Sequence, residues 1–92
     1  MPDEPGAPDR ERFIYRADLV ERLWEHGVHP TPRTPPELVR GFVRELYKYE
    51  IRRLRARMLR AEFPRAEYAG RVDDLRRRYA VLSLLPRQFL AG

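Results

Sequence analysis

Apolar residues recur at steps of three and four over three stretches of this chain, and Pro- or Gly-containing segments separate the stretches. This spacing is typical of helices with one buried face. In the first stretch, residues 9–26, one such face carries Phe13, Ala17, Val20 and Trp24. We therefore expect a first helix over 9–26, with these four side chains in the core.

Two starts are compatible with this first helix. Asp9 could cap a long helix, or Asp18 could cap a shorter one with Glu21 completing a capping box. We favour one helix that bends near Arg16. Gly27 is suited to the left-handed conformation that ends many helices, so it predicts the C-terminal end.

The segment GVHPTPRTPP, residues 27–36, predicts a stiff, extended connector, because its prolines remove backbone donors and favour polyproline geometry. It ends in TPPE. Thr34 is expected to cap the next helix, with Pro35 at the first helical position and Glu37 three residues after the cap.

A second, long helix is predicted over 35–63. Its apolar positions are Val39, Phe42, Val43, Leu46, Tyr47, Ile51, Leu54, Met58 and Ala61. At 100° per residue, the faces of its first and second halves differ by roughly 90–100°. A helix whose buried face turns in this way needs two neighbours. We expect the first helix on its N-terminal half and a third helix on its C-terminal half.

Phe63-Pro64 should end this helix, and Tyr68, Val72, Leu75 and Tyr79 predict the third helix over 65–79. The short break between the two helices predicts an antiparallel hairpin. Residues 80–92 are apolar but have no helical stripe, so this segment either caps the bundle or docks on another chain.

The expected fold is therefore all-α: a three-helix bundle with a long central helix and a C-terminal helical hairpin. Residues 1–8 are expected to be a disordered tail, and 9–92 a single small domain. The chain has no cysteine and no apolar run near the ~20 residues of a membrane-spanning helix. With a polar, acidic N-terminus, this pattern predicts a cytoplasmic protein without a membrane partner.

The positive charge is concentrated in one block of the chain. Residues 40–60 carry eight basic and two acidic side chains, whereas residues 1–39 carry five basic and eight acidic ones. Eighteen of the nineteen basic residues are Arg, and the chain has no Asn, a profile that suits a GC-rich genome. Part of the Arg excess therefore reflects composition rather than binding.

Five of these basic residues form one stripe along the predicted long helix. They are Arg40, Arg44, Lys48, Arg52 and Arg55, at steps of four, four, four and three. Such a ridge could contact the phosphates of a nucleic acid or an acidic protein partner. Alternatively, it is a solvated face that keeps a long helix soluble. Asn and Gln side chains that could read bases are absent from these helices.

Other candidate chemistry has a simpler structural explanation. Tyr47 and Tyr49 lie ~200° apart on a helix, so they cannot form one base-stacking platform. His26 and His29 lack the third ligand that zinc needs, so no metal is expected. Asp73 and Asp74 diverge on a helix and should pair with the arginines that follow them.

These patterns identify no catalytic residue and no cofactor or small-molecule substrate. We expect a non-enzymatic helical protein-interaction or self-association module, with a protein partner or a second copy bound. The candidate interface comprises Ile51, Leu54, Met58, Leu84, Leu85, Phe89 and Leu90. The alternative function is sequence-independent nucleic-acid binding through the basic ridge.

Overall fold

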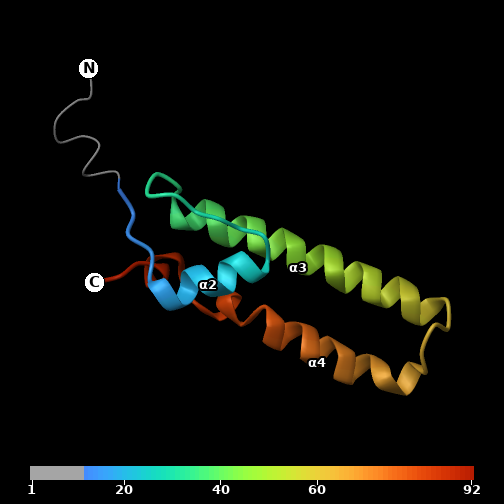
Figure 1. The fold of residues 1–92 in the computed structure, drawn as a ribbon. Coiled ribbons are helices and arrows are strands. Elements are labelled where there is room, and N and C mark those ends of the chain that lie inside the picture. Colours follow the sequence, from blue (N-terminus) through green and yellow to red (C-terminus); the bar gives the residue numbers. More distant parts are fainter. Residues whose placement is uncertain (1–11) are drawn as a thin grey trace.

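The computed structural model describes residues 12–92 and confirms the all-α class (Figure 1). The helices are α2 (Ala17–Glu25), α3 (Pro36–Leu59) and α4 (Tyr68–Arg78), with 3₁₀ turns η1 (Arg65–Glu67), η2 (Ala80–Ser83) and η3 (Pro86–Phe89). In residues 12–92, β pairing is limited to one isolated antiparallel bridge, between Tyr15 and Leu90. The predicted tail 1–8 and the candidate cap Asp9 lie outside the described residues.

The first helix is shorter than predicted, and neither predicted start is correct. Residues 12–16 are extended, and α2 begins after Arg16 without a side-chain cap. The extended segment is held by distant backbone groups: the Arg16 N–H donates to Phe89 O at 3.0 Å, and Ile14 O accepts from the Ala91 N–H at 2.8 Å. These pairings satisfy the backbone without a helix, which explains why local periodicity was misleading here.

The buried face of α2 also differs from the predicted one. Leu19 and Leu23 are 4% and 0% exposed, whereas Trp24 is 58% exposed and Ala17 is exposed. The core residues of α2 are therefore Leu19 and Leu23, which lie beside the predicted stripe. Trp24 lies beside the His29 ring, with the ring centroids 5.1 Å apart.

Helix α3 begins one residue later than predicted, at Pro36, after Pro35 as the N-cap residue. Thr34 is not the cap: its Oγ1 accepts instead from the Thr31 N–H at 3.0 Å, inside the connector. Residues 27–35 contain no helix, but the predicted extended geometry is interrupted by a turn in which the Thr34 N–H donates to Thr31 O at 3.0 Å. Pro36 occupies the start of α3, where its missing donor costs nothing.

Helix α3 ends four residues earlier than predicted, at Leu59, in a Schellman arrangement. The Ala61 N–H donates to Met58 O at 2.9 Å, and the Glu62 N–H donates to Arg57 O at 3.0 Å. Ala61 has a φ of 61°, in the left-handed region where Gly is usual. The chain then turns through η1 into α4, which runs back antiparallel to α3 (Figure 1).

The two halves of α3 have different neighbours, but one of them differs from the prediction. Helix α4 packs along the C-terminal half, and the centroids of the Tyr47 and Tyr79 rings lie 5.3 Å apart. The N-terminal half packs chiefly on η2 and η3 rather than on α2, which packs mainly on η2. Residues 80–92 therefore fill the space between α2 and α3.

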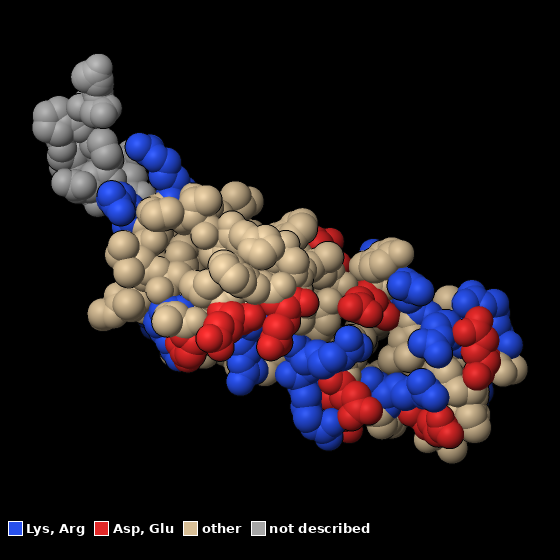
Figure 2. Space-filling view, in the orientation of Figure 1, with Lys and Arg blue, Asp and Glu red and all other residues tan. Residues whose placement is uncertain are grey.

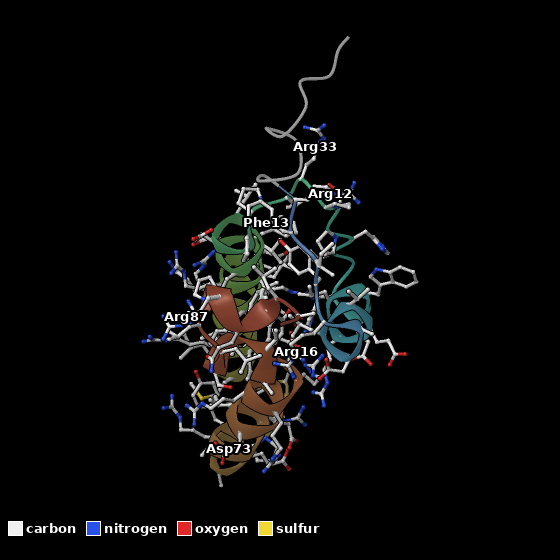
Figure 3. All side chains as sticks on the ribbon, turned by 90° about the vertical axis from the view of Figure 1, so that its left-hand side faces the viewer. Arg12, Phe13, Arg16, Arg33, Asp73 and Arg87 are labelled. Carbon is white, nitrogen blue, oxygen red and sulfur yellow. The ribbon has the colours of Figure 1, made fainter. Side chains whose placement is uncertain are left out.

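One apolar core connects these elements. It contains Leu19, Leu23, Val28, Val39, Val43, Leu54, Phe63, Leu75, Tyr79, Val81 and Phe89. Phe89, in the segment whose path the sequence left open, is 0% exposed and among the largest fully buried side chains. Figure 3 views the molecule from the end that contains the C-terminal segment. Arg16 lies on the α2 side of that segment and Arg87 on the α3 side.

Candidate functional site

The predicted basic ridge loses its first member to the fold. Arg40 donates from Nε to Leu84 O at 2.8 Å and from Nη2 to Leu82 O at 2.6 Å. Both carbonyls belong to the C-terminal segment, so this partly buried guanidinium ties that segment to α3. We therefore exclude Arg40 from the candidate phosphate contacts.

The other four ridge residues are exposed on α3 and form what we call the basic stripe: Arg44, Lys48, Arg52 and Arg55. Lys48 pairs with Glu45 at 3.3 Å, and both side chains are more than half exposed. Within residues 12–92, no ion pair involves Arg44, Arg52 or Arg55. The stripe therefore presents three uncompensated cations to solvent.

The opposite flank of the α3–α4 hairpin has more arginines but a more balanced charge. A groove of about 380 Å³ between the two helices is lined by Arg53, Arg57, Arg71 and Arg78, and also by Glu50 and Asp74. Arg57 pairs with Glu62 at 3.1 Å, and Arg71 pairs with Glu67 at 3.0 Å. Figure 2 shows basic and acidic side chains interleaved over this half of the molecule. This balance makes the groove a weaker anion site than the stripe.

Two of the predicted interface residues are core residues. Leu54 is 8% exposed under α4, and Phe89 is fully buried, so neither is accessible to a partner. Ile51, Met58 and Leu84 are partly buried against the same core, and Leu90 is partly buried where it bridges to Tyr15. Leu85 alone of the set is substantially exposed, at 47%.

The large apolar side chains exposed on α3 are absent from the predicted interface. Leu38, Phe42, Tyr49 and Leu59 are 64%, 54%, 53% and 60% exposed. All four lie on the side of α3 turned away from its core face, which we call the outer face. Phe42 follows Val39 at helical spacing, which predicts a core position, but its side chain is exposed. A signal was available, since Leu38 and Tyr49 fall outside the buried stripe at positions normally polar.

Two further large apolar side chains are exposed away from α3. Trp24 lies on α2 and Ile14 on the extended N-terminal segment, each 58% exposed. In Figure 2, the half of the molecule that contains α2 is covered mainly by uncharged residues, whereas charged residues dominate the α3–α4 hairpin. On the face that Figure 2 shows, uncharged residues therefore gather over one half of the molecule and charged residues over the other.

Most polar groups that line a pocket of about 600 Å³ beside α4 and η2 already have partners. Asp73 pairs with Arg76 at 3.4 Å, and Arg77 pairs with Asp74 at 2.6 Å, as the sequence predicts. Ser83 Oγ donates to Ala80 O at 2.8 Å. In residues 12–92, no three His, Cys, Asp or Glu side chains are placed to hold a metal ion.

Tyr79 links three elements at the edge of this cavity. Its hydroxyl donates to Glu50 Oε2 at 3.0 Å, and its ring stacks on His26 with the centroids 4.2 Å apart. Burial and then the Glu50 carboxylate raise the pKa of Tyr79 to about 12. His26, at the C-terminal end of α2, therefore packs against the Tyr79 ring.

No protein-family model, curated protein or solved structure matches this chain. None of the helices in residues 12–92 combines the length and apolar character needed to cross a bilayer. Functional inference therefore depends on the surface of the molecule itself.

Proposed function

We propose that the protein is a non-enzymatic helical protein-interaction module that binds through the outer face of α3. In this proposal the chain is a three-helix bundle, α3 is its long central helix, and α3 and α4 form its C-terminal hairpin. The observation that carries the proposal is the exposure of four large apolar side chains on one helix of 24 residues. Scattered exposed apolar residues are ordinary, but a row along one helix face is typical of helix-mediated recognition.

The fold favours this use of α3. Helix α4 and the C-terminal segment occupy its inner face, so the outer face is presented as a straight, rigid row. A preformed helix face loses little conformational entropy on binding. Large aromatic side chains such as Phe42 and Tyr49 are also the residue types that contribute most to interfaces.

Affinity capture with the full chain as bait, from nuclease-treated lysate of its source organism, tests the proposal. F42E should abolish retention of the specific partner, because it replaces a large apolar side chain of the row with a charge. W24E is the matched control, since Trp24 is equally large and exposed but lies on α2, and it should retain the partner. Each retained protein is then purified, and its affinity for the full chain and for the two variants is measured by titration. The proposal fails if no protein binds with this pattern and the chain does not self-associate.

The three uncompensated arginines of the basic stripe support a second candidate, sequence-independent nucleic-acid binding. Counterion release predicts that the affinity for any duplex falls steeply with salt. R44E/K48E should weaken binding of a fluorescent duplex to all sequences alike. R33E/R87E is the control, because it reverses the same number of exposed charges at positions outside the basic stripe (Figure 3). Undetectable binding at about 50 mM salt would rule this candidate out.

A further inference from the structure

The outer face of α3 carries a complete coiled-coil spacing, which we call the outer seam. Its members are Leu38, Phe42, Glu45, Tyr49, Arg52, Ala56 and Leu59, at steps of four and three in strict alternation. This is the repeat that keeps one stripe facing a partner helix. Ala56 is half-buried and the other six residues are exposed, so the seam runs uncovered along nearly all of α3.

The seam is arranged symmetrically about Tyr49. At 1.5 Å per residue, Leu38 and Leu59 lie about 16 and 15 Å to either side of it, and Glu45 and Arg52 lie about 6 and 4.5 Å away. A second copy of the helix in the antiparallel direction brings Leu38 near the other chain's Leu59. The same pairing brings Glu45 of each chain near Arg52 of the other, so the pair of helices contains two such contacts.

From this self-complementarity we infer that the partner of the outer seam is a second copy of the same chain, paired antiparallel through α3. The inference rests on the proposed function and names its partner. A parallel pair would instead place Glu45 against Glu45 and Arg52 against Arg52, which is repulsive. A heterologous partner would not require opposite charges at matched distances from the centre.

Two charged residues among seven seam positions imply a weak, reversible dimer. Polar residues in a seam lower stability while they fix register and orientation. Lys48, which pairs with Glu45 in the free chain at 3.3 Å, is exposed and can release Glu45 to Arg52 of the second copy. Glu45 and Arg52 thus act as orientation determinants, whereas Leu38, Phe42, Tyr49 and Leu59 supply the buried apolar area.

Variants of the full chain with reversed charges at Glu45 and Arg52 test the pairing. Sedimentation equilibrium measures the dissociation constant of the dimer for each variant. E45R and R52E should each weaken the dimer by about tenfold or more, because each converts two attractive contacts into repulsive ones. The double variant E45R/R52E should return the dissociation constant to near the wild-type value. W24E, outside the seam, should leave it unchanged. All three substituted positions are exposed, and circular dichroism checks that the variants are folded.

Disulfide trapping gives the orientation directly, because the chain has no native cysteine. A mixture of L38C and L59C should form the mixed cross-link, and L38C alone should not. A monomer at all concentrations, a double variant that is not rescued, or a cross-link of L38C to itself would overturn the inference. If the chain is monomeric but F42E still abolishes capture of another protein, the inference fails and the proposed function stands.

Discussion

At the scale of single residues, Tyr79 shows how the fold controls one ionisable group. The folded chain raises the pKa of this phenol to about 12 through burial and the Glu50 carboxylate. The pKa of Tyr15, whose hydroxyl donates to Thr34 O, is also raised to about 12, by burial and then by the Glu37 carboxylate. Because both neutral phenols are favoured by folding, their contribution is present below the unfolded pKa of about 10 and lost as pH rises toward 12.

We therefore expect the free energy of unfolding to fall above pH 10, by at most about 1.4 kcal/mol per pH unit for each tyrosine. Urea titrations from about pH 9 to 11.5 measure this slope. Y79F should reduce it, and at neutral pH should cost about 1–2 kcal/mol through the lost bond to Glu50. Y49F, at an exposed tyrosine, is the control. An unchanged slope in Y79F would contradict this account.

At the scale of elements, the end of α3 contains a local conflict between sequence and geometry. The Schellman turn needs a left-handed residue, and Ala61 supplies it at a φ of 61°. Alanine has a steric cost there that glycine avoids. A61G should therefore raise the free energy of unfolding by about 0.5–1 kcal/mol.

The same substitution at a residue with ordinary right-handed helical backbone should have the opposite sign. A69G, at an exposed position of α4, should lower the free energy of unfolding by about 0.5–1 kcal/mol. Chemical denaturation of both variants gives the comparison. Destabilisation by A61G as well as A69G would show that the turn does not hold a left-handed residue in solution.

The elements that the sequence predicted best are those governed by local signals. The connector prolines place the start of α3 within one residue, and Phe63-Pro64 places the hairpin turn between α3 and α4. Residues 12–16 were predicted wrongly because their partners, Phe89 and Ala91, lie more than seventy residues away. The role of Arg40 was missed for the same reason, since helical spacing does not reveal bonds to the carbonyls of Leu82 and Leu84.

At the scale of the whole molecule, the C-terminal segment closes the fold rather than extending from it. It packs between α2 and α3, pairs with the extended N-terminal segment through the Tyr15–Leu90 bridge, and is held to α3 by Arg40. This arrangement covers apolar residues that sequence alone assigned to an interface. It leaves the outer face of α3 as the main exposed apolar row, so the folding of residues 80–92 determines which surface remains for a partner.

Phe89 is the side chain on which this closure depends most. It is completely buried, and its backbone carbonyl accepts from the Arg16 N–H at 3.0 Å. F89A should cost about 3–5 kcal/mol, because it removes a large core side chain and leaves a cavity. A domain of this size is stable by only about 5–15 kcal/mol, so a large share of that margin would be lost.

Because one core connects α2, α3, α4 and the C-terminal segment, we expect F89A to lower the midpoint of a single cooperative transition. Urea unfolding followed by both far-ultraviolet dichroism and Trp24 fluorescence tests this, since Trp24 reports on α2. L85A, at a half-exposed position in the same segment, should cost less than about 1 kcal/mol. Wild-type stability in F89A, or dichroism and fluorescence transitions that separate, would mean that the segment is not part of the core. In that case residues 80–92 would again be available to a partner.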